Sequence, residues 1–471
     1  STVVRRGYDG RKAWAIHLGY TLDIRLSEDL DEAALLQRMA ARHVQATPDM
    51  RYHFVARAPE NLRERPVVVG MGPCGLFAGL LLAQMGFRPV ILERGKAVRE
   101  RTKDTWGLWR KGVLNPESNV QFGEGGAGTF SDGKLYSQIK DPQHLGRKVL
   151  EEFVKAGAPE EILYVSKPHI GTFRLVSMIE RMREEITRLG GEIRFGSRVE
   201  GLLFDVTGIT NATDATSPKH VRAVSLQDGS VLETRHLVLA VGHSARDTFA
   251  MLHQAGVFME AKPFSIGVRI EHPQSLIDRA RFGKFAGHPL LGAADYKLVH
   301  HASNGRSAYS FCMCPGGTVV AASSEPERVV TNGMSQYSRN ERNANSALVV
   351  DVRPDDFFDD AQKNPLAGID FQRHWESRAF AVGGGDYSAP AQRVGDFLAG
   401  RASTHLGEVQ PSYTPGVKPA NLADCLPDYV VAALREALPA FARQIRGYDL
   451  ADALMTGVET RTSSPLRIRR G

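Results

Sequence analysis

The sequence has few cysteines and no long hydrophobic run. Only four of its 471 residues are cysteine, which is too few for a disulfide framework in a chain of this length. The low count favours a reducing compartment, so we expect the protein in the cytoplasm. No uninterrupted apolar stretch reaches the ~18 residues that cross a bilayer, so we expect no membrane span. The N-terminal residues also lack the apolar core of a signal peptide.

The sequence also lacks a dense basic run interleaved with aromatic residues, so we expect no nucleic-acid partner. The net charge is nevertheless +6 and the isoelectric point about 9.1. This diffuse excess favours ligands that carry phosphate. With 42% hydrophobic and 24% charged residues, the composition is that of a globular protein. A length of 471 residues predicts two or three domains.

The most informative stretch covers residues 65–95. It opens with the β-branched run Val67–Val69, which predicts a short buried strand. Gly70, Gly72 and Gly75 follow in the order G-x-G-x-x-G. In a dinucleotide-binding turn the first glycine permits the tight bend, the second lets a pyrophosphate approach the backbone, and the third lets helix and strand pack closely. The glycines alone are also compatible with a purely structural turn.

The elements after these glycines favour dinucleotide binding over a structural turn. An apolar, helix-like run extends from Leu76 to Met85, and its N-terminus would present free N–H groups to the pyrophosphate. A second strand, Pro89–Leu92, ends at Glu93, which stands 23 residues after Gly70. An offset of roughly 20 residues suits an acid that binds the ribose. The ending ERG is more typical of FAD-binding than of NAD-binding proteins.

A basic stretch and a second glycine-rich segment come next. Residues 94–111 carry seven lysines and arginines, and we expect a solvated helix face. The segment NVQFGEGGAGTFSDGKLYSQI contains five glycines, which cost backbone entropy. Aromatic and apolar residues interleaved with them would anchor the backbone, which favours a loop folded against a flat ligand over a flexible surface loop. Ser131 and Lys134 are its candidate polar contacts.

A third motif is LVLAVGH at residues 237–243. It predicts a buried parallel strand that ends in glycine. A strand of this kind lies near the cofactor in two-domain flavoproteins, so we expect Gly242 beside the cofactor. A lone histidine is usually structural, and His243 is therefore only a candidate for chemistry.

The regions around these motifs predict further elements. Residues 1–64 predict a small α/β module, with strands at 14–24 and 51–56 and a helix at 29–43. Apolar residues at helical spacing predict a helix over 174–190.

The second half of the sequence has a different character. Residues 201–232 predict a strand pair with a polar, Thr-rich tip. From residue 261 to 385, strand-like pieces separated by polar turns predict an antiparallel sheet. Within it, residues 330–350 are rich in Asn and Arg and predict a polar loop or helix start. Residues 368–400 predict two helices joined by a glycine turn, and 429–445 predict another helix.

Cys312 and Cys314 are alternate residues of a strand-like run, so both side chains should face one way. They could form a redox pair or half of a metal site. No second pair of ligands stands at metal spacing, and ordinary buried thiols are favoured. We therefore expect no metal.

Taken together, these motifs make the sequence similar to a family of uncharacterised FAD-dependent dehydrogenases among the glutathione-reductase-like flavoproteins. The resemblance extends from the first predicted strand of the dinucleotide-binding stretch to the C-terminus. The motifs that carry it are VGMGPCGLFAG, FGEGGAGTFSDGKL, AVGHSARDTF, YSFCMCPGG, VTNGMSQYSRNERNANSALVV, AFAVGGGDYSAPAQ and GVETRTSSPLRIRR. The resemblance implies bound FAD and an oxidoreductase, but no particular substrate.

An α/β organisation is implied as well. We expect the small module at 1–64 and a Rossmann-like FAD-binding domain at 65–258, a parallel sheet with helices on both faces. An antiparallel-sheet substrate domain should follow at 259–455, before residues 456–471 return to the FAD-binding domain. Members of the family continue past the segment TRTSSP into another glycine-rich stretch that completes the flavin site. We expect this sequence, which stops at Gly471, to lack that piece and to retain FAD less tightly.

We therefore expect a FAD-dependent oxidoreductase of an unassigned small-molecule substrate, with the flavin cycling by hydride or two-electron transfer. Only one nucleotide-binding fingerprint is present, so NADH or NADPH would bind transiently in the substrate cleft. The alternative is a non-catalytic FAD-binding sensor or interaction module. The candidate catalytic residues are His243, Lys134 and Arg461, the last within a donor-rich segment that should return to the flavin. The expected cofactor-binding residues are Gly70, Gly72, Pro73, Cys74, Gly75, Glu93, Arg94, Gly125, Gly126, Gly128, Thr129, Ser131 and Gly242.

Overall fold

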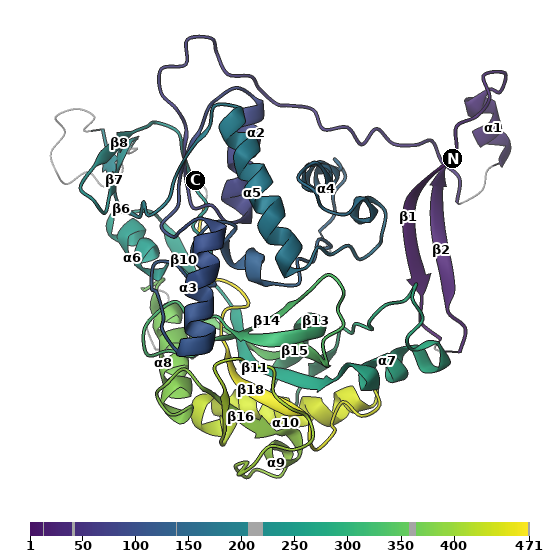
Figure 1. Ribbon diagram of the computed structural model, residues 1–471, viewed down its shortest axis with the longest axis vertical. Coiled ribbons are helices and arrows are strands. Elements are labelled where there is room, and N and C mark those ends of the chain that lie inside the picture. Colours follow the sequence, from purple (N-terminus) through teal and green to yellow (C-terminus); the bar gives the residue numbers. More distant parts are fainter. Residues whose placement is uncertain (13, 40–42, 138, 206–219, 358–363, 470–471) are drawn as a thin grey trace.

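The computed structural model describes residues 1–471 with the exception of 13, 40–42, 138, 206–219, 358–363 and 470–471. Figure 1 shows a smaller body above a larger sheet, with an N-terminal hairpin at the side. The Thr-rich tip that the sequence predicts lies outside the described residues.

The smaller body is built on a parallel sheet. Its strand order is β5-β4-β3-β9, where β3 is Val67–Val69, β4 Val90–Leu92, β5 Glu192–Arg194 and β9 Leu237–Leu239. All three pairings are parallel, which confirms the strands that the sequence predicts here. Because the carboxyl ends of parallel strands meet at one edge, the loops that follow β3, β4 and β9 lie close together.

The two faces of this sheet are covered differently. Helices α2 (Pro73–Gln84) and α5 (Thr172–Arg188) pack on one face. The other face packs against an antiparallel sheet of β6 (Val199–Phe204), β7 (Val221–Leu226) and β8 (Val231–Glu233). The expectation of helices on both faces is therefore wrong. The apolar face of β6–β8 buries the strands in place of a helix.

Three more helices and two short 3₁₀ helices are found among the described residues of the smaller body. Helix α5 is the one that the apolar spacing predicts, and α6 follows β9 at the carboxyl edge of the sheet. The additional elements are α3 (Val98–Lys111), α4 (Leu145–Lys155), α6 (Arg246–Gln254), η1 (Gly126–Phe130) and η2 (Glu160–Leu163).

The larger sheet has the order β12-β13-β15-β11-β18-β16-β17, with β14 paired to β13. Its pairings are antiparallel except that of β16 with β17, so the predicted antiparallel sheet is present. Most of the buried apolar side chains of this half form one cluster on the sheet. The strands are β11 (Phe264–Pro273), β12 (Val299–His301), β13 (Ser307–Ala321), β14 (Thr331–Ser335), β15 (Asn343–Val352), β16 (Ala389–Arg393), β17 (Val417–Pro419) and β18 (Leu454–Glu459).

Helices pack around this sheet, with α8 at its left and α10 beneath it in Figure 1. Strand β10 (Met259–Ala261) pairs with β19 (Leu466–Ile468) and ties the C-terminal segment to the smaller body. No helix among the described residues is long and apolar enough to cross a membrane. The remaining helices are α7 (Gln274–Phe282), η3 (Gly283–Phe285), η4 (Pro354–Asp356), α8 (Ala367–Val382), α9 (Val394–Leu398), η5 (Leu422–Cys425) and α10 (Asp428–Ala442).

Two predictions for this half are wrong. Residues 330–350 form β14 and β15 rather than a polar loop, because β11 supplies partners for their polar side chains: Asn345 Oδ1 accepts a hydrogen bond from Arg269 at 3.2 Å. The second helix predicted within 368–400 is instead β16 and the short α9. Strand β18 also continues the sheet to Glu459, past the expected boundary at residue 455.

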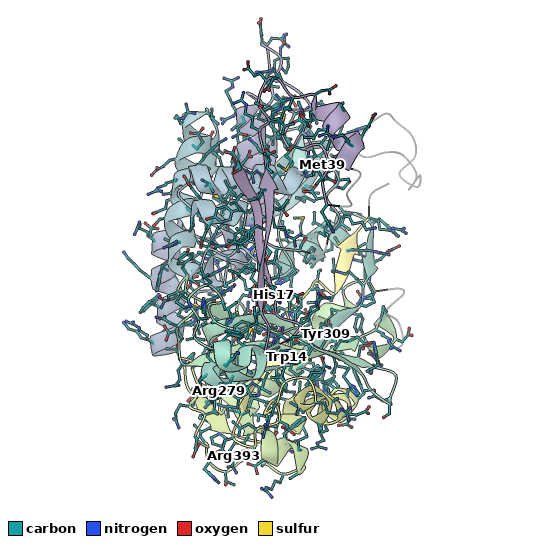
Figure 2. The ribbon with its side chains drawn as sticks, turned by 90° about the vertical axis from the view of Figure 1, so that its right-hand side faces the viewer. Trp14, His17, Met39, Arg279, Tyr309 and Arg393 are labelled. Carbon is teal, nitrogen blue, oxygen red and sulfur yellow. The ribbon has the colours of Figure 1, made fainter. Side chains whose placement is uncertain are left out.

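The N-terminal module is a hairpin and a helix. It contains β1 (Thr2–Asp9), β2 (His17–Asp23) and α1 (Glu32–Met39), whereas the strand predicted at 51–56 does not form. None of the described residues before Arg65 is buried. Figures 1 and 2 show the hairpin extending along the side of the molecule toward α7, where the Tyr8 ring lies 5.7 Å from that of Phe282.

Candidate functional site

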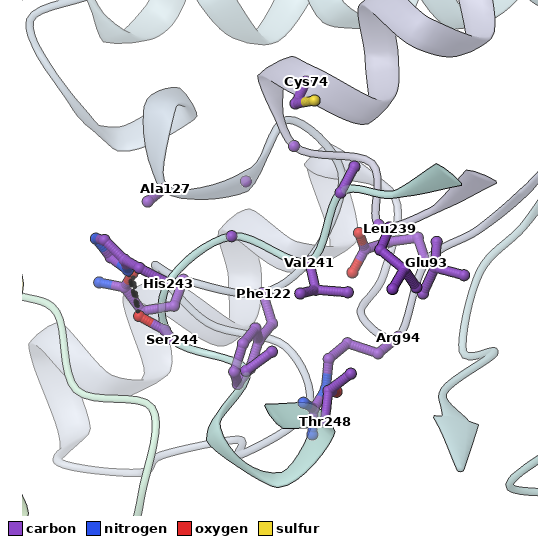
Figure 3. A pocket seen from close by; sticks show the side chains of 18 of the residues that line it. Cys74, Glu93, Arg94, Phe122, Ala127, Leu239, Val241, His243, Ser244 and Thr248 are labelled. Atoms are coloured by element: carbon purple, nitrogen blue, oxygen red, sulfur yellow. Dashed lines mark hydrogen bonds between the residues drawn. The ribbon is translucent and has the colours of Figure 1, made fainter. Parts of the chain in front are cut away.

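A cavity of about 580 Å³ lies at the carboxyl edge of the parallel sheet. Figure 3 shows Cys74 at the start of α2, Glu93 after β4, and His243 and Ser244 after β9 around it. The wall also contains residues of the second glycine-rich segment and Ser464 of the C-terminal segment. The site therefore collects the loops that a parallel sheet brings to one edge.

The three glycines of the G-x-G-x-x-G turn have different surroundings. Gly70 has a φ of +96°, and a Cβ there would lie 2.5 Å from the carbonyl oxygen of Ala240. A Cβ at Gly75 would lie 1.8 Å from the carbonyl oxygen of Gly70. At Gly72 the nearest neighbour of a Cβ is the Cα of Gly126, at 3.7 Å. Protein contacts explain the first and third glycines, whereas the space at Gly72 opens to the cavity.

The N-terminus of α2 lies next to this open space. Gly72 is the N-cap and provides no side-chain cap, and Pro73 occupies the first turn. Pro73 and Cys74 both line the cavity. Because the first-turn N–H groups of a helix lack intrahelical acceptors, this end suits an anionic ligand.

Glu93 lies in the cavity wall but is only 4% exposed. One carboxylate oxygen accepts the N–H of Met71 at 2.8 Å. The other accepts the N–H groups of Gly95 at 2.8 Å and Gly123 at 3.0 Å. A carboxylate offers about four lone pairs. Glu93 therefore fixes three backbone segments and retains acceptor capacity for one further donor.

Arg94 is held by two carboxylates at the cavity wall. It donates to Glu117 at 3.0 Å through Nε and Nη2, and to Asp247 at 2.8 and 2.9 Å through Nη1 and Nη2. Burial alone would lower the pKa of Arg94, but the hydrogen bonds with Asp247 and Glu117 outweigh it and raise the pKa. The guanidinium lies 4.2 Å from the ring centroid of Phe122. Because two carboxylates already pair with its charge, Arg94 presents the flat guanidinium surface to the cavity rather than an unpaired charge.

The second glycine-rich segment contributes only part of its predicted contacts. Gly126 and Gly128 line the cavity, whereas Gly125, Thr129 and Ser131 are absent from its wall. A Cβ at Gly125 would lie 2.2 Å from Thr129 Oγ1. The hydroxyl of Ser131 donates to the Gly128 carbonyl at 2.7 Å. These three residues therefore contact other parts of the segment and fix its shape without lining the cavity.

A buried arginine holds this segment in place. Arg101 is fully buried, and its guanidinium donates to the carbonyls of Asn119, Val120 and Glu124 at 2.6–2.7 Å and of Gly126 at 2.9 Å. Burial lowers the pKa of Arg101 to about 10, so the side chain remains charged at pH 7. The expectation that this basic stretch forms a solvated face is therefore wrong at Arg101. The carbonyls of a tight glycine-rich loop need a donor, and Arg101 supplies it.

His243 lies in the cavity wall at the end of a hydrogen-bonded chain. Its Nδ1 is 2.9 Å from Ser244 Oγ, whose hydroxyl donates to Gln121 Oε1 at 3.0 Å. Gln121 in turn donates to the carbonyl of Ala322 at 3.2 Å. Burial and the charge of Arg461 lower the pKa of His243 to about 4. The imidazole is therefore neutral at pH 7.

The other two catalytic candidates, Lys134 and Arg461, do not line the cavity. Lys134 donates through Nζ to the carbonyl of Met313. Arg461 is buried, and it donates to Glu376 at 3.2 and 3.1 Å and to Ser324 at 2.6 Å. Their cationic groups face the protein interior instead.

Glu376 joins two arginines in a buried network. It accepts hydrogen bonds from Arg246 at 2.7 and 2.9 Å as well as from Arg461. Burial alone would raise the pKa of Glu376, but the two guanidinium groups hold it well below its ordinary value. Within the segment that the sequence predicts to return to the flavin, Ser464 reaches the cavity wall.

Several further wall residues are not among the expected cofactor-binding residues. The loop after β5 and the first turn of α6 both occupy the carboxyl edge, so the strand-order rule could have found them once β5 and β9 were placed. The C-terminal wall residues lie in the segment 456–471, which the sequence predicts to return to the FAD-binding domain, but no spacing rule singles them out. These unpredicted wall residues include Gln121, Phe122, Ser197, Arg198, Val199, Ser244, Thr248, Phe249, Leu466 and Ile468.

A known protein resembles this chain over nearly its full length. An uncharacterized protein of Clostridium beijerinckii is 47% identical over 469 residues, which is 99% of this chain and 84% of the relative. Residues 263–462 match the family model of the FAD-dependent protein, C-terminal domain-like. The chain belongs to the same family as the Clostridium beijerinckii protein, and its residues 263–462 are the part that matches the FAD-dependent model. It is a flavoprotein, and its cofactor is FAD, as predicted.

Solved structures resemble the flavoprotein only weakly. THI4 of Thermovibrio ammonificans is 16% identical, with a TM-score of 0.28 over 50% of this chain and 76% of THI4. An FAD complex of the halogenase PltM is 11% identical, with a TM-score of 0.34 over 66% and 55%. The L-amino acid deaminase of Proteus myxofaciens is 13% identical, with a TM-score of 0.27 over 47% and 54%. Scores of this size add nothing to the assignment.

Proposed function

We propose that the flavoprotein is an oxidoreductase of the glutathione-reductase-like group, which transfers a hydride or two electrons between FAD and a small-molecule substrate. The observation that supports this proposal is the extent of one cavity, which reaches from Gly72 past Glu93 to His243 and Ser464. The Gly72 end suits a pyrophosphate. The His243 end lies where the loop after β9 meets the C-terminal segment, so a reacting group there would lie between these two segments.

The adenosine half of the cofactor fits the residues at one end. The open space at Gly72 and the free N–H groups of α2 would receive the pyrophosphate. The remaining acceptor capacity of Glu93 suits a ribose hydroxyl. The flat guanidinium of Arg94, fixed by Glu117 and Asp247, would pack against the adenine.

The opposite end of the cavity would hold the flavin ring. Bound FAD supplies the two-electron chemistry, and the protein supplies position and electrostatics. His243 lies at this end, and its lowered pKa keeps the imidazole neutral at pH 7. A neutral imidazole can accept or share a proton but adds no positive charge. The chain through Ser244 to Gln121 fixes the imidazole, so we assign His243 to hydrogen bonding with the flavin or the substrate.

The electron donor is the remaining part of the proposal. One dinucleotide-type turn is found among the described residues, and FAD occupies it in this account. NADH or NADPH would then bind transiently in the substrate cleft, beside the larger sheet. The substrate would be a small molecule.

Anaerobic titration of the FAD-loaded protein with NADH and NADPH tests the proposal. We expect saturable bleaching of the flavin band. Bleaching should be slower in His243→Asn, because the asparagine amide can replace the hydrogen bond of one imidazole nitrogen but cannot relay a proton. Dithionite serves as a control that the flavin is reducible. If dithionite reduces the flavin, neither nucleotide does, and a stable protein partner co-purifies, the chain is the non-catalytic FAD-binding module instead.

A further inference from the structure

Cys312 and Cys314 lie at a distortion in the longest strand. Strand β13 pairs with β15 through Phe311 and Ala347 and then through Cys314 and Asn345. Three steps along β13 thus match two along β15, which defines a β-bulge. Cys312 has a φ of +46°, a conformation that residues other than glycine seldom adopt. The bulge breaks the alternation that the sequence predicts and brings Cys314 Sγ within 3.4 Å of the Cys312 carbonyl oxygen.

Two cations bind the backbone of this pair. Arg269 donates through Nη1 to the carbonyl of Cys312 at 3.0 Å, and Lys134 donates through Nζ to the carbonyl of Met313. The thiol of Cys314 also donates to the Cys312 carbonyl at 3.4 Å. The two cations therefore hold the distorted backbone and lie close to the cysteine pair, with Glu459 and Asp132 as their acidic partners.

The environment distinguishes the two thiols. A hydrogen bond with Cys314, together with the charges of Lys134 and Arg269, holds the pKa of Cys312 well below its ordinary value in spite of burial. The same hydrogen bond and burial raise the pKa of Cys314. Cys425 provides a contrast within the chain, because burial raises its pKa to about 12.

The two cysteines also differ in solvent exposure. Cys312 is half-buried and Cys314 is buried, so a small reagent reaches Cys312 first. A partly accessible thiolate with two cations nearby and a second thiol two residues away is the arrangement of a reactive and a resolving cysteine. An ordinary structural thiol such as Cys425 has none of these features.

We propose that Cys312 and Cys314 form a redox-active dithiol that a hydroperoxide oxidises to an intramolecular disulfide. The thiolate of Cys312 attacks one peroxide oxygen, so an S–O bond forms, the O–O bond breaks, and the other oxygen leaves as hydroxide or alkoxide, which solvent protonates. Cys314 then attacks the Cys312 sulfur: the S–S bond forms, the S–O bond breaks, and the thiol proton leaves with the hydroxyl as water. Two thiols lose two electrons, and the peroxide gains them.

The test uses the full chain loaded with FAD, treated with one equivalent of hydrogen peroxide, denatured, alkylated and digested with trypsin. Both cysteines lie in the tryptic peptide 307–328. We expect this peptide to lose two hydrogens and escape alkylation, and dithiothreitol to restore both thiols. In Cys314→Ser, dimedone should trap a sulfenic acid on Cys312. In Cys312→Ser, neither product should form.

Charge variants test the mechanism separately from folding. Lys134→Met should slow disulfide formation by about tenfold, because the thiolate fraction falls, and Lys134→Arg should restore most of the rate. Lys167→Met, which removes an exposed lysine paired with Asp295 at 2.7 Å, is the matched control. The proposal is overturned if the peptide keeps both thiols while Cys74 or Cys425 is oxidised, or if it gains oxygen at Met313 without losing two hydrogens.

Discussion

The carboxylate of Glu93 accepts a hydrogen bond from the backbone N–H of Met71 at 2.8 Å. This bond joins the end of β4 to the turn between β3 and α2, and the second oxygen joins Gly95 to the second glycine-rich segment at Gly123. The acid that the sequence singles out for a ribose is thus also the acceptor for three buried N–H groups. Cofactor binding and the shape of the cavity depend on the same side chain.

Substitution of Glu93 should therefore weaken FAD binding even when the substitution is conservative. Glu93→Gln places an amide NH₂ against a backbone N–H, so we expect a loss of about 1.5–3 kcal/mol, or roughly tenfold to 150-fold in Kd. Glu93→Ala should lose at least as much. Fluorescence titration of apoprotein with FAD measures the change, with Glu185→Gln on the outer face of α5 as the control. Unchanged affinity in both variants would place the ribose elsewhere.

Two glycines of the turn should differ in how strongly their substitution destabilises the apoprotein. Gly75→Ala would place a Cβ 1.8 Å from the carbonyl oxygen of Gly70, and we expect a loss of about 3 kcal/mol or more from overpacking. In Gly72→Ala the nearest neighbour of the Cβ lies at 3.7 Å, so the apoprotein should retain its Tm. Thermal unfolding of both apoproteins measures the difference. Equal Tm losses would mean that protein packing, not ligand space, requires the second glycine.

The network around Glu376 should act through stability. Glu376→Gln leaves Arg246 and Arg461 buried with reduced charge compensation, and breaking such a pair costs about 3–5 kcal/mol. Urea unfolding at pH 7 measures this loss. Asp370→Asn on the same helix is the control, because Asp370 is exposed and its ion pair with Arg373 is longer, at 3.4 Å. Arg461→Ala should likewise lower stability more than it slows flavin reduction.

Buried His272 should make the protein less stable in mild acid. Its Nε2 is 2.6 Å from the Tyr448 carbonyl, and burial lowers its pKa to about 4. The unfolded chain binds the proton more tightly, at a pKa near 6.5, so stability falls as the pH drops from about 6.5 to 4. We expect a loss of about 3 kcal/mol from this group. His272→Gln should flatten the profile and exposed His253→Gln should not, as measured by unfolding at pH 7 and pH 4.

The sequence predicts the parts of the site that depend on short-range relations. Val67–Val69, the three glycines, α2 and Glu93 lie within one stretch, and each has a backbone or packing role that fixes its residue type. Hence the parallel strands and the FAD cofactor could be predicted before the structure was known. Gly126 and Gly128 of the second glycine-rich segment could be named as cavity residues for the same reason.

Long-range polar partners could not be predicted. The sequence predicts Arg101 on a solvated face because charged side chains are usually solvated. Nothing in the sequence singles out Arg246 and Glu376 as partners, because they stand 130 residues apart. The same reasoning made Asn345 a loop residue, although Arg269 of a neighbouring strand satisfies it inside the sheet. A buried polar group is recognisable only with its partner, and the partner is supplied by the tertiary fold.

The most direct test of the account is a titration of FAD into the apoprotein, wild type against Gly72→Val. A branched side chain at Gly72 would fill the space assigned to the pyrophosphate. The account predicts saturation at one FAD per wild-type chain, and no saturable binding by a Gly72→Val protein that keeps the wild-type circular dichroism spectrum. Equimolar, undiminished FAD binding by folded Gly72→Val would contradict the placement of the cofactor in this cavity.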